Sequence, residues 1–292
     1  MTMFIDLHTH STCSDGLLTP SALLNLAARR KLAAIALTDH DTVAGLPEAF
    51  AHGKITGVEV ISGIEISSNL EGVALHILGY GFNHEHPALL PFITRLQQAR
   101  HNRNQGILER LQVLGISITR EELAQIAGGQ AGRPHFARLL VQKGRAKKIQ
   151  DAFSLYLKRG APAFVEHVKP QAAEVISCIT EAGGLAVLAH PACSDPGLER
   201  IPSLVAQLKD YGLAGIETFY PTHSKKVCRF LQQLAAKHSL LLSGGTDYHG
   251  DSHSTTPLGG NAKTMRVPLQ LLHDIKQRLA SAAVTPPQNQ AG

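Results

Sequence analysis

Cysteine is scarce in this chain of 292 residues: the four cysteines have no close spacing and form no CxxC pair. This usage excludes a disulfide-built scaffold and a cysteine zinc knuckle, and it suits the reducing cytoplasm. No apolar run approaches the ~18 residues that a membrane span needs, so no membrane contact is predicted. Asp6 and His8 interrupt the start of the chain, where an export signal would need an unbroken apolar stretch. The sequence therefore favours a cytoplasmic protein.

Charged residues are also few, at 17% of the chain against 43% hydrophobic residues, which is typical of a globular protein with a substantial core. Their signs are unevenly spread. Residues 91–165 hold 13 Lys and Arg against 4 Asp and Glu, a net charge of +9, whereas the remainder holds 15 against 19, a net charge of −4. Residues 143–148 alone could be a solvated helix end. The asymmetry of the whole segment favours a basic lid that faces an anionic ligand.

Short apolar segments alternate with helical patterns along most of the chain. This alternation predicts βα units around a mostly parallel sheet, and seven or eight strands would suffice to close a barrel. Polar residues follow several of these strands, as in barrels whose chemistry lies at the carboxyl ends of the strands. The expected strands are residues 4–7, 33–37, 58–66 (with a break near Gly63 left open), 73–78, 185–188, 215–219 and 240–243.

The middle of the chain departs from this alternation. It shows a long amphipathic helix over residues 91–114, a capping box at Thr119, a third helix beginning at Gly132-Arg-Pro-His, and no convincing strand. We therefore expect a discontinuous barrel domain with a basic helical insertion and a disordered tail. The predicted bounds are 1–90 and 166–284 for the barrel, 91–165 for the insertion and 285–292 for the tail.

Histidines and carboxylates recur where the expected strands end. His8 and His10 are two residues apart in a strand and so share a face, which suits a pair of metal ligands, although an HxH pair alone is a weak signal. Asp15 precedes a glycine and could equally form a turn. Glu65 lies among apolar residues, where a carboxylate is costly unless it is paired or metal-bound. His76, alone on an apolar strand, could equally be a core histidine.

The same pattern returns at three more strand ends, in TDHD at residues 38–41, AHP at 189–191 and GTDYH at 245–249. A mixed set of imidazoles and carboxylates without cysteine suits zinc, manganese or iron. The candidates exceed the needs of one ion, so two or three metals are expected. The nine candidate ligands are His8, His10, Asp15, His40, Glu65, His76, His190, Asp247 and His249.

In this order, HxH, Asp-Gly, TDHD, GIE, an isolated histidine, AHP and GTDYH resemble the motifs of the polymerase-and-histidinol-phosphatase (PHP) family. The resemblance covers nearly the whole chain and implies a distorted (β/α)7 TIM-like barrel of the amidohydrolase superfamily, and a metal-dependent phosphoesterase. It implies two or three divalent ions, manganese first, with zinc, iron or magnesium as alternatives. The implied ligands are His8, His10, Glu65 and Asp247 for one ion, Glu65, His76 and His190 for a second, and Asp15, His40 and His249 for a third.

The insertion resembles that of a PHP subgroup containing 3′,5′-nucleoside bisphosphate phosphatases and 5′-to-3′ exoribonucleases. This implies a hydrolase of nucleotide metabolism that converts adenosine 3′,5′-bisphosphate to AMP and phosphate. The expected reaction is attack on phosphorus by a hydroxide held between metals, because metal binding makes hydroxide available at neutral pH. The hydroxide would be held by Glu65, Asp247 and His190, with Asp15, His40 and His249 near the leaving group.

Selectivity for a nucleotide requires residues beyond the metal ligands. Arg133 and His135 flank Pro134 at an expected helix N-terminus, where free backbone N–H groups favour a phosphate. Arg100, Asn102 and Arg103 could offer a second cationic contact from one helical turn. The competing interpretation of these arginines is a solvated helix face.

Other functions remain open at this stage. Two are enzymatic: a 5′-to-3′ exoribonuclease acting on short 5′-phosphorylated RNA, and a histidinol-phosphate phosphatase. The non-enzymatic alternative is a metal-binding accessory module of a replicase, although nothing in the chain resembles a fused polymerase. Substrate tests with metal supplied would separate these alternatives.

Overall fold

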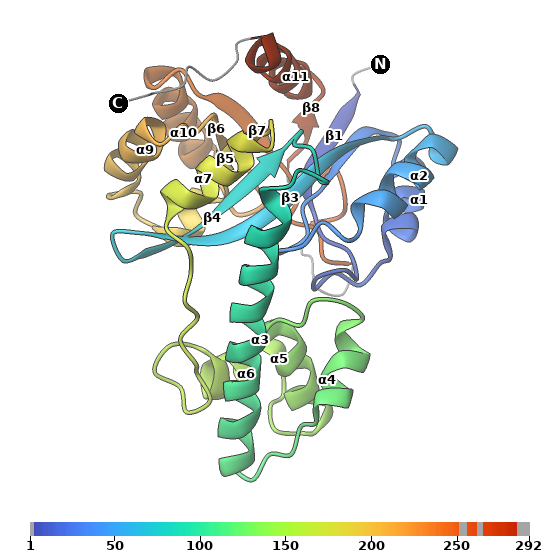
Figure 1. Ribbon diagram of the computed structural model, residues 1–292, viewed down its shortest axis with the longest axis vertical. Helices are drawn as coiled ribbons and strands as arrows, with labels where there is room; N and C mark the ends of the chain where they lie inside the picture. Colours follow the sequence, from blue (N-terminus) through green and yellow to red (C-terminus); the bar gives the residue numbers. More distant parts are fainter. Residues whose placement is uncertain (1–2, 251–255, 262–264, 285–292) are drawn as a thin grey trace.

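The computed structural model describes residues 3–250, 256–261 and 265–284. The described residues form one eight-stranded sheet in the order β7-β6-β5-β4-β3-β2-β1-β8. Below this sheet in Figure 1 lies a separate group of helices that is joined to it by the long helix α3 (Leu89–Val113). The strands are β1 (Phe4–Thr9), β2 (Leu32–Leu37), β3 (Glu59–Leu70), β4 (Val73–Tyr80), β5 (Leu185–Leu188), β6 (Gly215–Phe219), β7 (Leu241–Gly244) and β8 (Val267–Pro268).

The sheet is mixed. Strands β1, β2 and β3 are parallel, as are β5, β6 and β7, whereas β4 runs antiparallel to both β3 and β5. The alternation of strand and helix breaks between β3 and β4, which form a hairpin through Glu71 and Gly72, both with positive φ. A bridge between Thr9 and Tyr248, which follows β7, draws the two ends of the sheet together. The sheet is thus a nearly closed barrel, which confirms the predicted fold class.

Close backbone contacts hold this barrel together at two glycines. Strand β3 runs unbroken through Gly63, where a Cβ atom would lie 2.5 Å from the carbonyl oxygen of Leu37 on β2. After β7, a Cβ atom on Gly245 would lie 2.3 Å from Cβ of His8. Only glycine permits these approaches, and the second one sets the GTDYH segment directly against β1.

Alternation along the strands separates two apolar clusters. On β1 and β2, Ile5, Leu7, Ala34 and Ala36 belong to an inner cluster that α11 joins through Leu272. On β2, the intervening Ile35 and Leu37 belong to an outer cluster beneath the surrounding helices. Those helices are α1 (Pro20–Arg29), α2 (Leu46–Thr56), α7 (Ala172–Glu181), α9 (Ile201–Asp210) and α10 (Lys225–Lys237). The short α8 (Pro191–Ser194) follows β5, and α11 (Gln270–Val284) packs on the inner cluster.

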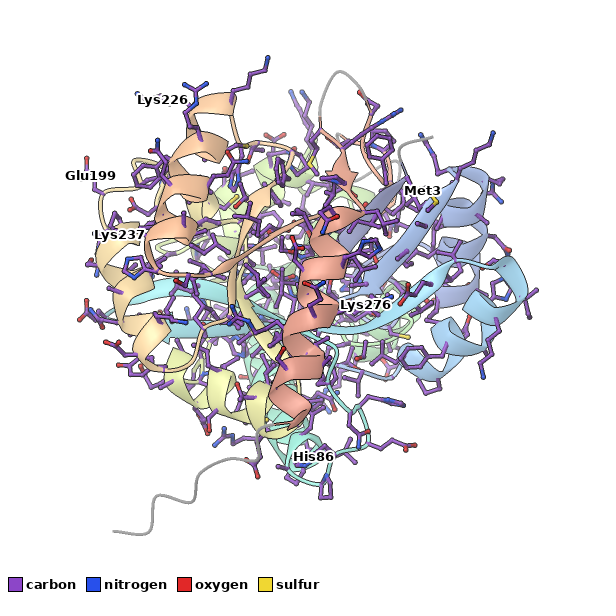
Figure 2. The ribbon with its side chains drawn as sticks, turned by 90° about the horizontal axis from the view of Figure 1, so that it is seen from above. Met3, His86, Glu199, Lys226, Lys237 and Lys276 are labelled. Carbon is purple, nitrogen blue, oxygen red and sulfur yellow. The ribbon has the colours of Figure 1, made fainter. Side chains whose placement is uncertain are left out.

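Helix α11 lies over the barrel end at which β1 begins, and Figure 2 shows it, marked by Lys276, crossing that end. The carboxyl ends of the parallel strands are therefore open toward the separate group of helices. That group contains α3 (Leu89–Val113), α4 (Arg120–Ala127), α5 (Arg133–Gln142), α6 (Ile149–Ala152) and the π-helical turn η1 (Phe153–Leu157). We call these five elements the helical lobe.

The helical lobe has a hydrophobic core of its own. Phe92 and Leu96, in the first turns of α3, pack on the outer cluster of the barrel, whereas Leu111 near its end packs with Phe136 in the lobe core. Helix α4 begins at the capping box that its sequence predicts at Thr119. None of the described helices combines the length and the apolarity needed to span a membrane. The predicted tail, residues 285–292, lies outside the described residues.

Candidate metal centre

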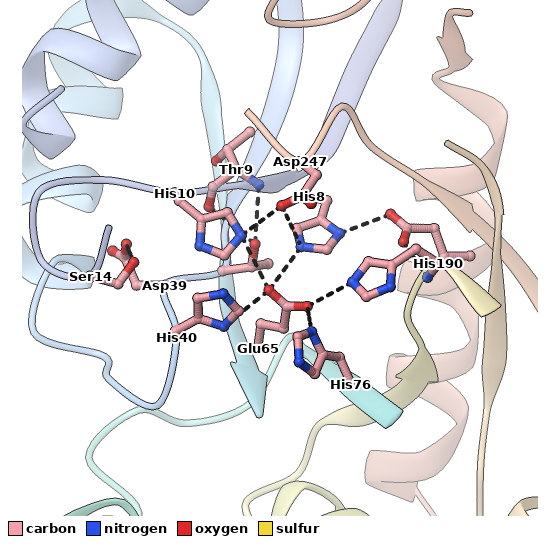
Figure 3. Close-up of polar contacts among 12 residues, drawn as sticks. His8, Thr9, His10, Ser14, Asp39, His40, Glu65, His76, His190 and Asp247 are labelled. Carbon is pink, nitrogen blue, oxygen red and sulfur yellow. Dashed lines mark hydrogen bonds and ion pairs between the residues drawn. The ribbon is translucent and has the colours of Figure 1, made fainter. Parts of the chain in front are cut away.

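The nine predicted ligands converge at the end of the barrel that faces the helical lobe. They come from or directly follow β1, β2, β3, β4, β5 and β7, so six strands contribute. Glu65 on β3 lies in the middle of Figure 3, surrounded by imidazole rings. Positions far apart in the sequence thus form a single cluster.

Glu65 is the shared partner of this cluster and is only 1% exposed. Its Oε1 lies 2.6 Å from Nδ1 of His76 and 3.0 Å from Nε2 of His190. Its other oxygen, Oε2, lies 3.1 Å from Nε2 of His8, 3.2 Å from Nε2 of His10 and 3.2 Å from Nδ1 of His40. A single carboxylate therefore contacts five imidazoles.

The electrostatics of the centre keep Glu65 ionised. Burial alone would raise the pKa of Glu65, but His40, His8 and His76 outweigh burial and hold that pKa well below its usual value. Burial would likewise raise the pKa of Asp247, but His8 and His249 outweigh burial and lower that pKa. Both side chains are accordingly carboxylates with lone pairs available to a cation.

Three groups of ligand atoms in this centre are close enough to hold an ion. The first has the predicted membership, the second contains His40 where His190 was predicted, and the third includes His10 in addition to the predicted residues. Nε2 of His190 still lies at Glu65, as given above. The groups are His8, His10, Glu65 and Asp247; His40, Glu65 and His76; and His10, Asp15, His40 and His249.

The donor set fits divalent cations. Buried polar atoms normally have hydrogen-bond partners, yet both ring nitrogens of His10 and Oδ1 of Asp15 and of Asp247 have none among the described residues. Nε2 of His10 lies 3.0 Å from Oδ1 of Asp247 without hydrogen-bond geometry. Imidazole nitrogens and carboxylate oxygens that converge in this way are suitable ligands for zinc, manganese or iron.

Backbone strain is concentrated at the same place. Seven described non-glycine residues have positive φ, and three of them, Asp41, His190 and Asp247, lie at this centre. His190 has φ 23° and ψ 60°, a sparsely populated conformation. Such strain persists only where surrounding contacts enforce it, and it is common at functional sites.

Glu217 on β6 supplies one of these contacts, and the sequence analysis missed it. It is fully buried; Oε1 accepts a hydrogen bond from Nδ1 of His8 at 3.0 Å, and Oε2 accepts one from the backbone N–H of His190 at 2.7 Å. In a neutral His8 ring, this bond leaves the Nε2 lone pair directed at Glu65. The isolated glutamate in Gly-Ile-Glu-Thr-Phe carries the same sequence signal as Glu65 and could have revealed it.

Two further buried carboxylates position the loops of the centre. Asp39 accepts hydrogen bonds from the backbone N–H of Ser11 at 2.7 Å and from the hydroxyl of Ser14 at 2.6 Å. It thereby orders the loop that carries Asp15.

Asp6 performs a similar task on β1. It accepts hydrogen bonds from the backbone N–H groups of Thr246 and Gly259, at 2.9 and 2.8 Å. Burial raises the pKa of Asp6 to about 6, although these hydrogen bonds oppose the rise. Asp6 therefore ties β1 to the segment that delivers Asp247.

A cavity of about 370 Å³ adjoins the centre on the side of the helical lobe. Asp15, His40 and His76 line it from the barrel. From the lobe, it is lined by three of the predicted substrate-binding residues, Arg100, Arg103 and Arg133. These arginines share the cavity wall with residues of the centre, so a ligand in the cavity can contact both.

The structure does not bring the other two predicted substrate-binding residues to this cavity. Asn102 is exposed and accepts a hydrogen bond from Gln98, because two residues along a helix rotate a side chain by about 200° away from Arg100. His135 is fully buried, and its Nδ1 accepts a hydrogen bond from the backbone N–H of Gly132 at 2.9 Å. It caps the start of α5 and does not line the cavity.

Known proteins resemble this chain in sequence and in fold. Residues 6–167 match the PHP domain. The chain is 35% identical to a 5′-3′ exoribonuclease of Haemophilus influenzae, over 85% of this chain and 91% of that protein. It is also 35% identical to a 3′,5′-nucleoside bisphosphate phosphatase of Chromobacterium violaceum, over 87% and 90% of the two chains. An amidohydrolase structure from C. violaceum, with bound sulfate and no metal, has a TM-score of 0.84 at 31% identity and covers 95% of this chain and 96% of its own.

Fold and site thus define the class of protein, which is a barrel with a cluster of histidines and carboxylates at its strand ends. The chain belongs to the PHP domain family, as its motifs predict. Within that family it is a phosphoesterase, and hence a hydrolase.

Replacing Glu65 with alanine should be the most damaging single change at the centre. The variant removes the carboxylate that all five imidazoles share, so metal affinity should fall by more than about 100-fold, since residues that only orient a ligand already contribute 10- to 100-fold. Elemental analysis after dialysis, with circular dichroism to verify folding, measures this effect. A folded Glu65→Ala protein with full metal content and near-normal turnover would refute the assignment.

Glu217→Gln tests the support of His8. The amide keeps the size of the side chain but presents a weaker acceptor to Nδ1 of His8, so metal affinity should fall roughly 10- to 100-fold. Chelator competition with Mn²⁺ or Zn²⁺ gives the affinity directly. Glu199→Gln, at an exposed position, is the matched control and should bind metal like the wild-type protein. Equal affinities for both variants would exclude the positioning role.

Proposed function

We propose that this protein is a metal-dependent phosphatase that removes the 3′-phosphate from nucleoside 3′,5′-bisphosphates, such as adenosine 3′,5′-bisphosphate. The observation that carries this proposal is the shared cavity described above. One end is the candidate metal centre, suited to a reacting phosphate, and the adjoining wall presents three guanidinium groups, suited to a second phosphate. A small substrate with two phosphates matches both ends.

The ions proposed for the centre are two or three divalent metals, with manganese as the first choice and zinc, iron or magnesium as alternatives. Bound there, they would supply activation of water and neutralisation of phosphate charge. The nine predicted ligands would hold them, with Glu65 belonging to two of the ligand groups given above and Glu217 fixing the ring of His8. The side chains of Asp15 and His249 lie 3.2 Å apart, and we expect both to face the leaving group of the substrate.

The arginines of the cavity repel one another, which supports an anionic ligand. Burial, together with the nearby charges of Arg100 and Arg133, lowers the pKa of Arg103 to about 9. Arg100 is paired with Asp41, to which its Nε donates at 2.9 Å. A phosphate would relieve the remaining repulsion, because guanidinium groups bind phosphate with charge-assisted hydrogen bonds.

Arg133 is the best placed of the three for this contact. Its guanidinium makes no hydrogen bond or ion pair with any described residue, although it lines the cavity. It is also the first residue of α5, where the positive end of the helix dipole favours an anion. We therefore assign it to the non-reacting phosphate of the substrate.

A second candidate is a 5′-to-3′ exoribonuclease acting on short RNA. A further hollow beyond His76 shares Arg133 and Lys169 with the cavity and extends to Arg200. This basic continuation offers room for more than one nucleotide, and one of the relatives described above is named as such an enzyme. The two candidates differ in the length of the nucleotide substrate that would occupy the cavity and this hollow.

A substrate panel tests both candidates. The purified protein, supplied with Mn²⁺, is assayed on adenosine 3′,5′-bisphosphate, a 5′-phosphorylated oligoribonucleotide and histidinol phosphate. We expect the highest kcat/KM on the bisphosphate, because it alone offers two phosphates on one sugar to the two ends of the cavity. Faster hydrolysis of the oligonucleotide would favour the second candidate, and preference for histidinol phosphate would refute both.

Arg133→Ala should lose kcat/KM selectively. A charge-assisted contact of this kind corresponds to roughly a 10- to 150-fold loss on adenosine 3′,5′-bisphosphate. The monophosphate p-nitrophenyl phosphate lacks the second phosphate and should lose far less, and metal content should not change. Arg120→Ala, an exposed arginine of the same lobe, is the control. Equal losses on both substrates would place Arg133 at the reacting phosphate instead.

A further inference from the structure

The cavity that holds the arginines also has an apolar side. Phe153 of η1 lines it, as do Phe164 and Val165 in the segment that follows η1. We propose that these three residues form the binding site for the nucleobase of the substrate, with the base stacked on the phenylalanine rings. This inference rests on the proposed function and extends it to the third part of a nucleotide, after its two phosphates.

Aromatic side chains are too few in this chain for their placement here to be trivial. The sequence has 9 Phe, 5 Tyr and no Trp in 292 residues, yet two phenylalanines line this one cavity. Phe164 is only partly buried and is not part of the hydrophobic core of the lobe, unlike Phe136. Its ring therefore faces the cavity without being needed to fill the lobe.

The backbone that carries this wall is held firmly by its neighbours. The guanidinium of Arg110 on α3 donates to the carbonyl oxygen of Phe164, and the N–H of Phe164 donates to Ala161 at 3.0 Å. Val165 lies directly against α3, since a Cβ atom on Gly106 would be 3.2 Å from its Cγ2. A wall fixed in advance binds a planar ligand at little cost in ordering.

Phe153 occupies an unusual backbone position. It is the first residue of η1, and its carbonyl accepts a hydrogen bond from the N–H of Lys158, five residues on, at 2.8 Å. Such π-helical turns are rare and occur frequently at functional sites. The wider turn is an independent indication that the Phe153 side of the cavity serves a ligand.

The chemistry of the wall predicts which bases it accepts. Among the described residues that line the cavity there is no Asn or Gln amide to read the edge of a base. Arg159 forms an ion pair with Glu166 at 2.7 Å, and the Arg159 guanidinium lies 6.0 Å from the centre of the Phe164 ring. Stacking tolerates any base, because every base has a π face. We therefore infer a base site that accepts purines and pyrimidines alike.

The test compares substrates with and without a base. Phe164→Ala should raise KM about 5- to 150-fold for adenosine and uridine 3′,5′-bisphosphates, the range expected for loss of one stacking contact. It should leave the hydrolysis of an abasic ribose 3,5-bisphosphate unchanged. Phe164→Tyr, which retains an aromatic ring, should restore nucleotide binding. Leu155→Ala, an exposed residue of η1 outside the cavity, is the matched control and should change neither substrate.

The outcomes separate this inference from the proposed function. If the wild-type protein hydrolyses none of the bisphosphates, the proposed function fails and the base site fails with it. If the wild-type protein hydrolyses them but Phe164→Ala affects nucleoside and abasic substrates equally, the base site alone is overturned. A strong preference for one base in the wild-type protein would overturn recognition by stacking.

Discussion

The buried charge of Glu65 is the constraint on which the arrangement of the barrel mouth depends. A carboxylate inside a protein is unfavourable unless positive charge or hydrogen-bond donors surround it. Here the compensation comes from imidazoles on or after β1, β2, β4 and β5, so these strand ends must all reach the same point. The mixed sheet satisfies this requirement, since the β3–β4 hairpin brings Glu65 and His76 together across neighbouring strands.

The same centre explains why polar residues lie so deep beneath it. Asp6, Asp39 and Glu217 are buried, and each accepts hydrogen bonds from a backbone segment that carries or adjoins a predicted ligand. Their partners are N–H and hydroxyl donors in fixed positions, so the loops after the strands cannot move independently. The barrel therefore presents its ligands as one preorganised set, in which a change at one strand end is felt at the others.

The sequence reveals most of the barrel and all nine residues of the cluster, because strand ends that carry polar residues after apolar runs are recognisable without coordinates. It does not reveal which side of a helix faces a cavity. Arg100 and Asn102 were indistinguishable by spacing, yet only Arg100 lies on the face of α3 that meets the cavity. The sequence likewise predicts that His135 binds a phosphate at the start of a helix, but packing of the lobe buries this side chain. The side of a helix that faces a cavity depends on tertiary contacts, which the local sequence pattern does not contain.

Helix α3 has a further consequence for how this protein tolerates change in length. Its first turns pack on the barrel, its middle carries Arg100 and Arg103, and its last turns pack in the lobe core. One inserted or deleted residue would rotate everything beyond it by about 100° and shift it by about 1.5 Å. The arginines would then leave the cavity, although no residue had been substituted. We therefore expect the length of α3 to be far less variable among relatives than that of the surface turn at residues 143–145, whose side chains are exposed.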